Sequence, residues 1–405
     1  MSFFKKTVTF ILVFALCFAS GSSALAVNIA SECDISDIDE AIDTSATVSV
    51  VGEQLEINAH SAVLIEQKSG TVLYEMNADE ALPLASITKI MSLLLIMETI
   101  DKGNLSLDES ITVSEHAASM GGSQIWLEEN EVMTVDDLLK AAVIASANDA
   151  TVALAEKVSG SEEGFVAAMN KKASELGMNS THFMNATGLD ADGHISTAHD
   201  VAVMSAELIS HELIKKYSTV WMDSLRSGET ELVNTNKLVR FYEGTTGLKT
   251  GTTDAAGYCL SATAERDGLS LVAVIMAGNT SNDRFNGAKK LLDYGFANYT
   301  VKKVKPELSK TAAPVKDGYS SSVSLAATEE YEVLMLKSDT GDIVQKTVLN
   351  KDIKAPVKKG DKLGVIEIYC GNELSGTVNI TAADTVERKT FFGIFLKTFR
   401  GLFIL

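Results

Sequence analysis

The order of strand-like and helix-like segments is the feature that most constrains how this chain can fold. Residues 61–67 and 71–75 flank a Lys-Ser-Gly turn and predict a β-hairpin. A long stretch of helical patterns follows. Strand patterns return at residues 258–265 and 269–277, and residues 283–299 then predict a final helix. We therefore expect a layered α/β domain whose antiparallel sheet is built from both ends of the domain.

Within the helical stretch, three apolar segments have recognisable limits. A strongly apolar helix is expected at residues 87–100. A second helix is expected to open at Thr134, with Asp137 three residues later as an imperfect capping box. Polar residues 146–149 predict a tight turn before the next apolar helix at residues 150–158.

The first 26 residues have the pattern of a secretory signal peptide. Lys5 and Lys6 form a short positive segment, residues 8–19 are almost all apolar, and Ala24 and Ala26 supply the A-x-A pattern of a cleavage site. The apolar run is too short for a typical membrane-spanning helix. We therefore expect an exported protein with a signal peptide at residues 1–26. Residues 27–50 contain six acidic residues and no Lys or Arg, which predicts a solvated acidic spacer.

A change in composition predicts a boundary between a main domain at residues 51–301 and a small all-β domain at residues 302–388. Pro306 and Pro314 lie just beyond this boundary, in a stretch with few large apolar residues. Farther on, short strand-like runs such as residues 363–369 alternate with Gly and Asp turns.

Residues 389–405 predict an amphipathic helix that lies on a membrane surface. At 100° per residue, one face gathers large apolar side chains, namely Phe391, Phe392, Phe395, Phe399, Leu402 and Phe403. The opposite face gathers Lys389, Gly393, Lys397 and Arg400. Two internal cations make the segment a poor candidate for crossing a bilayer. The alternative, a core helix of the last domain, would need a large groove to bury so many aromatic rings.

Charge is unevenly distributed along the chain. The whole chain carries −19, whereas residues 302–405 hold 16 basic and 13 acidic residues and so a net charge of +3. The acidic main part argues against nucleic-acid binding, which favours basic patches. The basic end suits the anionic surface of a membrane.

Ser86 and Lys89 are the first residues with catalytic potential. Because they lie three positions apart at a helix start, their side chains share one face. A neutral lysine there could take the proton of the serine hydroxyl, provided that burial and nearby positive charge favour the neutral amine. The helix N-terminus adds N–H groups where an oxyanion would develop. Ser2 and Lys5 have the same spacing in the signal peptide, so the pair alone is a weak signal and a surface pair is the competing interpretation.

Ser146 and Asn148 follow in the turn between two predicted helices. A second hydroxyl there could relay a proton to a leaving amine, and the amide of Asn148 could hold a substrate carbonyl. The competing interpretation is a helix break in which Asn148 caps the next helix.

Lys249, Thr250 and Gly251 lie on residues 247–253, which predict a strand. An extended peptide could pair with the edge of such a strand, and Gly251 would allow a close approach. The ammonium group and the hydroxyls, including that of Thr252, could then bind a free C-terminal carboxylate. A solvated edge strand is the alternative.

In combination, the three motifs resemble those of the penicillin-recognising serine enzymes. Ser-x-x-Lys, Ser-x-Asn and Lys-Thr-Gly occur in this order behind a signal peptide. The resemblance is closest to the low-molecular-mass penicillin-binding proteins that act as D,D-carboxypeptidases, and it covers residues 55–300. It extends to Pro83-Leu-Ala-Ser-Ile-Thr-Lys-Ile-Met91, Leu176-Gly-Met178, Thr187-Gly-Leu189, Gly193-His-Ile-Ser-Thr197 and Leu291-Leu-Asp-Tyr-Gly-Phe296.

This resemblance implies a β-lactamase/transpeptidase-like domain, with an antiparallel sheet between helices and a helical subdomain, followed by the small β domain and the tail helix. It implies a serine-type D-Ala-D-Ala carboxypeptidase that removes the terminal D-Ala from peptidoglycan pentapeptide stems through an acyl-enzyme. Its partners would be these stem peptides, β-lactam antibiotics as inhibitors, and a membrane surface. No metal or other cofactor is implied. We expect the enzyme at the outer face of the cytoplasmic membrane.

The resemblance also implies roles for individual residues. Ser86 is the acylated nucleophile and Lys89 its base, and Ser146 completes the catalytic group. Substrate-binding roles are implied for Asn148, Lys249, Thr250, Gly251 and Thr252. Backbone N–H groups of Ser86 and Thr252 would form the oxyanion hole. Arg284 is expected to help bind the substrate carboxylate, and a surface arginine at a helix start is the alternative.

The histidines and cysteines predict no further site. No H-E-x-x-H pattern occurs, and His194 and His199 are expected in a surface loop rather than in a zinc site. Cys33, Cys259 and Cys370 of the expected mature chain are interpreted as isolated, mostly buried thiols.

Three other functions stay open at this point. A serine β-lactamase needs a deacylating carboxylate between the second and third motifs, and Glu175 approaches the usual Glu-x-x-Leu-Asn pattern, except that Met178 replaces the Leu. Ser-Ala-Asn also departs from the Ser-Asp-Asn of class A β-lactamases. A non-catalytic wall-binding scaffold of the same fold is disfavoured because the catalytic residue types are intact. Transpeptidation depends on whether an amine or water reaches the acyl-enzyme.

Overall fold

The computed structural model describes residues 55–339, 341–391 and 393. These residues divide into two compact units, and the chain passes from the first to the second between Gly295 and Phe296. The expected signal peptide and acidic spacer lie outside the described residues. So does the expected tail helix, apart from residues 389–391 and 393.

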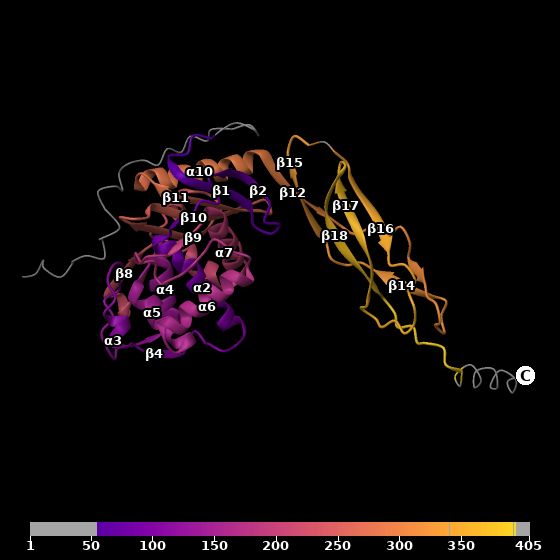
Figure 1. Cartoon of the computed structure of the whole chain (residues 1–405), viewed down its shortest axis with the longest axis horizontal. Helices are drawn as coiled ribbons and strands as arrows, with labels where there is room; N and C mark the ends of the chain where they lie inside the picture. The colour runs from indigo at the N-terminus through magenta and orange to yellow at the C-terminus, as the bar shows by residue number, and fades with distance from the viewer. Residues whose placement is uncertain (1–54, 340, 392, 394–405) are drawn as a thin grey trace, which may run out of the picture. The chain divides into compact units, whose positions relative to one another are not determined.

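A five-stranded sheet forms the centre of the first unit (Figure 1). Its strands are β1 (Ala59–Glu66), β2 (Val72–Met76), β9 (Thr245–Thr253), β10 (Gly257–Arg266) and β11 (Leu269–Gly278). They lie in the order β2-β1-β11-β10-β9, which leaves β9 at one edge. β1 pairs antiparallel with β11, with Val63 opposite Val274. The prediction of a sheet built from both ends of the domain is confirmed.

Helices lie on both faces of this sheet, as predicted (Figure 1). On one face, α10 (Ser281–Asn298) packs so closely that a Cβ at Gly295 would stand 2.5 Å from a Leu271 methyl carbon. On the other face, α7 (Ala198–Ser210) approaches β10, where the hydroxyls of Ser205 and Ser261 are 2.8 Å apart.

The first unit has further helices, most of which gather in a lobe below the sheet in Figure 1. They are α2 (Lys89–Asp101), α3 (Glu115–Ala118), α4 (Val135–Ile144), α5 (Asn148–Ser159), α6 (Glu162–Glu175), α8 (Glu212–Ser218) and α9 (Leu238–Phe241). α2 is apolar on almost every face and is buried between α5, α6 and α7, since such a helix needs neighbours all round.

Short strand pairs and 3₁₀ turns complete the lobe. The pairs are β3 (Leu82–Pro83) with β6 (Ile195–Ser196), β4 (Ser110–Thr112) with β5 (Val132–Thr134), and β7 (Met222–Leu225) with β8 (Thr230–Val233). The 3₁₀ turns are η2 (Ala85–Thr88) and η3 (Arg226–Gly228).

The predicted start of α4 is confirmed, whereas the helices expected from residues 87, 150 and 283 begin two residues away, as α2 at Lys89, α5 at Asn148 and α10 at Ser281. Thr134 caps α4, because its Oγ1 accepts the N–H of Asp137 at 3.1 Å. The apolar helix expected from residue 87 begins instead as η2, and α2 follows from Lys89. Both helix types bring residue i+3 near residue i, so the change does not separate Ser86 from Lys89.

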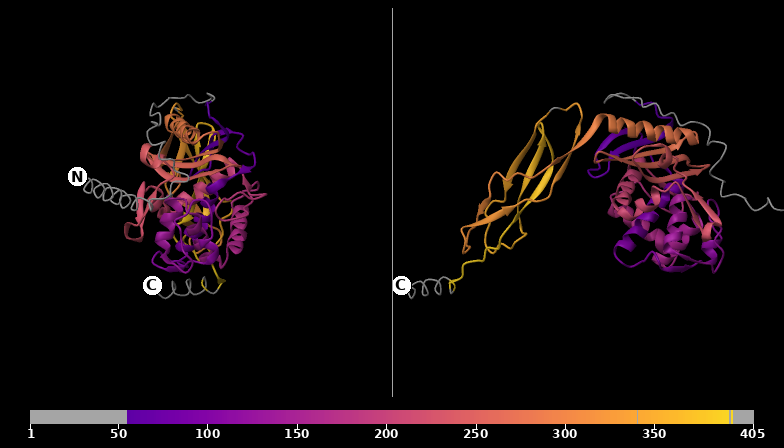
Figure 2. Two further views of the ribbon diagram at one scale, coloured as in Figure 1. Left: turned by 90° about the vertical axis from the view of Figure 1, so that its left-hand side faces the viewer. Right: turned by 180° about the vertical axis from the view of Figure 1, so that it is seen from behind.

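The second unit is all-β, as predicted. Its strands are β12 (Tyr299–Val304), β13 (Ala312–Pro314), β14 (Ser322–Ala326), β15 (Tyr331–Leu336), β16 (Ile343–Leu349), β17 (Lys362–Cys370) and β18 (Glu373–Ala382). β12 pairs with β15, and the others form a sheet in the order β13-β14-β18-β17-β16, whose long strands run side by side in Figure 2. Ile366, Ile368 and Ile380 lie in its apolar core. Within the described part of the chain, no helix combines the length and hydropathy that crossing a bilayer requires.

Candidate active site

Ser86 and Lys89 meet at the junction of η2 and α2. Lys89 is fully buried, and its Nζ donates hydrogen bonds to Ser86 Oγ and to the Thr187 carbonyl oxygen, each at 2.9 Å. Ser86 is half-buried, whereas the other residues from 84 to 91 are buried. A buried amine is costly unless it is hydrogen-bonded. These two acceptors therefore fix the amine beside the one hydroxyl of this segment that solvent reaches.

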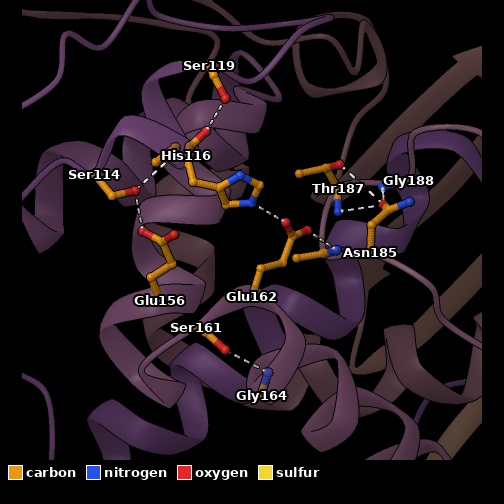
Figure 3. Close-up of polar contacts among 12 residues, drawn as sticks. Ser114, His116, Ser119, Glu156, Ser161, Glu162, Gly164, Asn185, Thr187 and Gly188 are labelled. Carbon is orange, nitrogen blue, oxygen red and sulfur yellow. Dashed lines mark hydrogen bonds and ion pairs between the residues drawn. The ribbon is translucent and has the colours of Figure 1, made fainter.

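The turn that carries Thr187 is tightly defined (Figure 3). Asn185 Oδ1 accepts the N–H of Thr187 at 3.1 Å and that of Gly188 at 2.7 Å. Gly188 has a φ of +91°, and a Cβ there would stand 1.8 Å from the carbonyl oxygen of Ala85. Only glycine fits such a position. The turn thus packs directly against the residue before Ser86.

Ser146 and Asn148 lie where α4 gives way to α5. Ser146 is buried with a φ of +62°, and its hydroxyl has no hydrogen-bond partner among the described residues. Asn148 donates from its backbone N–H to Ser123 O at 2.6 Å and from Nδ2 to Gly121 O at 2.7 Å. The alternative that Asn148 caps α5 is wrong, because the cap position is Ala147.

A buried carboxylate supports the chain segment that faces Asn148. Asp149 accepts the N–H groups of Ile125 at 3.1 Å and Leu127 at 3.0 Å. Burial raises the pKa of Asp149, and the backbone hydrogen bonds partly oppose that shift. Arg226 holds the same segment from outside, since its Nη1 donates to Ile125 O at 2.9 Å.

The Lys-Thr-Gly motif lies on β9 and packs against η2. A Cβ at Gly251 would stand 2.8 Å from Ser86 N and 2.9 Å from Ile87 N, so a larger residue would push the strand away from the serine. Lys249 and Thr250 on the same strand are buried. The alternative of a solvated edge strand is therefore wrong for these positions.

A chain of hydrogen bonds links β9 to the end of α4. Thr250 Oγ1 donates to Thr235 Oγ1 at 2.7 Å, and Thr235 N donates to Ile144 O at 3.1 Å. Ile144 is the last residue of α4, directly before the turn of Ser146. The structure thus connects all three predicted motifs. Gly251 links the Lys-Thr-Gly motif to the Ser-x-x-Lys motif, and Thr235 links it to the Ser-x-Asn motif.

Arg284 lies beneath β9 rather than on the surface, so the surface alternative is wrong. It is 6% exposed, and its Nη1 donates to Gly251 O at 3.1 Å and to Thr252 Oγ1 at 2.8 Å. Its guanidinium also lies over the rings of Tyr258 and Phe285. An arginine packed and bonded in this way fixes the strand and orients the hydroxyl of Thr252.

The cysteines of the described chain are both free. Cys259 lies on β10 opposite Gly251 and is fully buried, and burial raises the pKa of its thiol to about 11. Cys370, at the end of β17, is half-buried. The expectation of isolated thiols is confirmed for both, and that of burial for Cys259.

His194 corrects the sequence prediction of a surface loop, because its ring is buried. Nδ1 accepts the N–H of Met184 at 2.9 Å, so the proton lies on Nε2, which donates to Thr88 Oγ1 at 2.7 Å. Burial lowers the pKa of His194 to about 4, with the charge of His182 as a smaller cause. Thr88 directly precedes Lys89, so this histidine supports the turn of the reactive pair. No group of three or more His, Cys, Asp or Glu side chains suited to a metal ion occurs in the described part of the chain.

Sequence reasoning missed three residues that shape the site. These residues act through backbone atoms or tertiary contacts, which leave no spacing pattern in a sequence. They are Thr187 with its carbonyl, Thr235 with its hydroxyl, and His194. Asn185 followed by Gly188 carries a turn signal that could have predicted the bend, although not its contact with Lys89.

Comparisons with known proteins decide the family. The family model of the D-alanyl-D-alanine carboxypeptidases matches residues 47–280, which is more than half of the chain, and the model of the penicillin-binding protein 5 C-terminal domain matches residues 299–388. The chain belongs to the D-alanyl-D-alanine carboxypeptidase family. Its activity is that of a serine-type D-alanyl-D-alanine carboxypeptidase, a hydrolase, and the predictions of family, fold class and activity are confirmed.

Individual members of the D-alanyl-D-alanine carboxypeptidase family match most of the chain. The D-alanyl-D-alanine carboxypeptidase DacF of Bacillus subtilis strain 168 is 42% identical over 353 residues, covering 86% of this chain and 90% of DacF. Penicillin binding protein 5 from Haemophilus influenzae superimposes with a TM-score of 0.73 at 29% identity, covering 83% of this chain and 99% of that one. Penicillin-binding protein D2 from Listeria monocytogenes, in its ampicillin-bound form, superimposes with a TM-score of 0.53 at 34% identity. This match covers 60% of this chain and 99% of that one.

Proposed function

We propose that this carboxypeptidase removes the terminal D-Ala from peptidoglycan pentapeptide stems, with Ser86 as nucleophile and Lys89 as base. The 2.9 Å contact between Lys89 Nζ and Ser86 Oγ carries this proposal. The neutral amine takes the hydroxyl proton while Oγ attacks the carbonyl carbon of the penultimate D-Ala. The peptide bond to the last D-Ala breaks, and an ester to Ser86 forms. Water then hydrolyses the ester and regenerates the hydroxyl.

Ser146 and two backbone N–H groups assist this reaction. The buried hydroxyl of Ser146, which bonds no described residue, would hand a proton to the departing amine of D-Ala. The developing oxyanion would accept hydrogen bonds from the N–H groups of Ser86 and Thr252. Their proximity is supported by Gly251, because a Cβ added there would stand 2.8 Å from Ser86 N.

Substrate would lie along β9, at the edge of the sheet. An extended peptide can pair there with the backbone, and Asn148 Oδ1, a buried acceptor without a partner in the described chain, would take a substrate N–H. The ammonium of Lys249 and the hydroxyl of Thr252 would bind the free carboxylate of the substrate. The hydroxyl of Thr250 would join them by turning its proton from Thr235 Oγ1 to the carboxylate. Arg284 would contribute through Thr252, whose hydroxyl it already orients.

β-Lactam antibiotics would acylate the same serine, because the strained amide of the ring offers Ser86 an equivalent carbonyl carbon. The D2 protein of Listeria, at 34% identity, has been seen in an ampicillin-bound form. A β-lactamase would also need a carboxylate in the cleft to release the adduct. Glu175, the residue closest to that pattern, is exposed at the end of α6 and pairs with Lys171 at 3.6 Å. A long-lived adduct is therefore expected.

The enzyme would act outside the cytoplasmic membrane, with residues 389–405 lying on its outer face. The signal-peptide pattern at residues 1–26 and the aromatic and basic faces of the tail support this location.

Deleting residues 390–405 should move the protein from the membrane fraction to the soluble fraction and leave peptide hydrolysis unchanged. Membrane association that survives the deletion contradicts the anchor.

Mass spectrometry of the penicillin-treated protein tests the nucleophile. The wild type should carry one penicillin adduct on the peptide that contains Ser86 and should release D-Ala from a pentapeptide ending in D-Ala-D-Ala. Ser86→Ala should lose both, whereas Ser69→Ala, at an exposed turn serine, should keep both. Labelling that persists in Ser86→Ala refutes the assignment, and labelling without any D-Ala release favours a wall-binding scaffold.

A further inference from the structure

Glu162, the first residue of α6, reaches into the turn that fixes Lys89 (Figure 3). Its Oε1 accepts the N–H of Ala186 at 2.9 Å. Its Oε2 lies 2.7 Å from Nε2 of His116 on α3. The side chain of Glu162 is 13% exposed and that of His116 is 52% exposed, so the contact with Ala186 is the more shielded of the two. A charged carboxylate thus connects two helices to a turn of the active site.

The contact with Ala186 lies one residue from the acceptor of the catalytic amine. Ala186 is fixed on both sides, because Ser92 Oγ donates to its carbonyl oxygen at 2.6 Å while Glu162 takes its N–H. The next residue, Thr187, offers its carbonyl oxygen to Lys89 Nζ. A shift of the backbone at Ala186 would therefore displace the neighbouring residue, whose carbonyl oxygen accepts from the amine.

A simpler explanation for Glu162 is that an acidic residue in the first turn stabilises α6 through the helix dipole. Glu163 occupies the same first turn, so it has the same relation to the dipole. Glu163 is exposed, however, whereas the carboxylate of Glu162 bonds the active-site turn. The dipole accounts for an acid in this turn but not for the bond to Ala186.

We propose that Glu162 is a positioning residue for Lys89 and that His116 holds its carboxylate in place. The inference rests on the proposed role of Lys89 as the base. Glu162 touches neither substrate nor the reacting atoms, and it acts through the peptide of Ala186 and the carbonyl of Thr187.

The surroundings of His116 favour its charged form. The hydrogen bond with Glu162 raises the pKa of His116 above its ordinary value. Burial is the next largest cause and opposes the shift, and the negative charges of Glu162, Glu156 and Glu163 add to the increase. Glu156 itself accepts a hydrogen bond from Ser114 Oγ at 2.7 Å, so it is oriented toward the start of α3. The imidazolium therefore gives Glu162 a local counter-charge.

Acylation by a fluorescent penicillin, measured on the full-length protein against pH, tests this proposal. Glu162→Ala should lower the second-order acylation rate about 10- to 100-fold, because a small misplacement of a catalytic group is costly. The acidic limb of the plot of acylation rate against pH should move to lower pH, since the protonated amine of Lys89 loses the Thr187 carbonyl as a fixed acceptor. Glu162→Gln keeps an amide oxygen for the N–H of Ala186 and should restore the rate to within about threefold of wild type. Glu163→Ala is the matched control and should behave as wild type.

The outcomes separate this inference from the proposed function. A wild type that is not acylated at Ser86 overturns both. If the wild type is acylated, an unchanged rate and pH profile in Glu162→Ala overturn the inference alone, as does an equal loss in Glu163→Ala. Should Glu162→Ala fail to fold, the comparison of Glu162→Gln with His116→Ala decides. An acylation rate near wild type for Glu162→Gln and a clear loss of rate for His116→Ala support the proposal, and any other result overturns it.

Discussion

The two units of the chain bury very different side chains. The first unit buries the amine of Lys89, the ammonium of Lys249 and the guanidinium of Arg284. Among the described residues from 296 onwards, no polar or charged side chain is buried, and the core is built from residues such as Ile366. Removing a charged group from water costs free energy, which hydrogen bonds and ion pairs offset only when their geometry is good. The first unit therefore keeps groups that its fold alone does not need, as a working active site requires.

This contrast predicts that similar structural damage has different consequences in the two units, and the glycines offer a matched pair. A Cβ at Gly188 would stand 1.8 Å from the carbonyl oxygen of Ala85, and one at Gly364 would stand 2.3 Å from that of Val348. Gly188→Ala should lower the penicillin acylation rate by about 100-fold or more, because it displaces the turn before Ser86. Stopped-flow labelling measures the loss.

The partner variant, Gly364→Ala, should lower the melting temperature of the second unit. Its acylation rate should stay within about twofold of wild type, since Gly364 belongs to the other compact unit, which has a core of its own. Calorimetry and the same labelling assay measure both quantities. If Gly188→Ala is acylated normally, or if Gly364→Ala is as inactive as Gly188→Ala, the contrast between the units is lost.

A second prediction uses pH. The pKa of His194 falls from 6.5 to about 4 on folding, so the unfolded chain binds a proton there that the folded chain refuses. The free energy of unfolding should therefore decrease as the pH falls from 6.5 through about 4, by on the order of 3 kcal/mol from this residue. Denaturant unfolding of the wild type and of His194→Gln at several pH values measures the difference. Parallel pH curves for the two proteins contradict it.

The smallest expected effect comes from the orphaned hydroxyl of Ser146. Because this buried group has no partner among the described residues, Ser146→Ala should raise the free energy of unfolding by about 1 kcal/mol. The same substitution should slow the release of D-Ala, because the leaving amine loses its proton donor. Urea unfolding and a D-Ala assay on one preparation measure both changes. A variant that is less stable than the wild type counts against the contrast between the units.

The predictions from sequence succeeded where local chemistry decides the structure. The cap of Thr134 and the spacing of Ser86 and Lys89 depend on residues within one turn, and both are found in the structure. The order of strand patterns also predicted a sheet built from both ends of the domain, although not the order of its strands.

The failures concern contacts between distant segments. His194 was expected on the surface, yet it is buried because the amide of Met184 and the hydroxyl of Thr88 satisfy both of its ring nitrogens. For Arg284, the sequence left a surface site open, although the residue is held beneath β9 by the carbonyl of Gly251. In a sequence, a buried polar residue cannot be distinguished from an exposed one, because its burial depends on partners that lie far away in the chain.

The burial of Cys259 directly behind Gly251 has a practical consequence for chemistry on this protein. With no exposed surface and a pKa of about 11, its thiol is protected from oxidation and from alkylating reagents, even outside the cytoplasm. Cys370, on the second unit, is the more accessible of the two described thiols. Once Cys17 and Cys33 have been replaced by serine, a maleimide dye should therefore label the β domain at a single position and report on it without disturbing the strand beside the nucleophile.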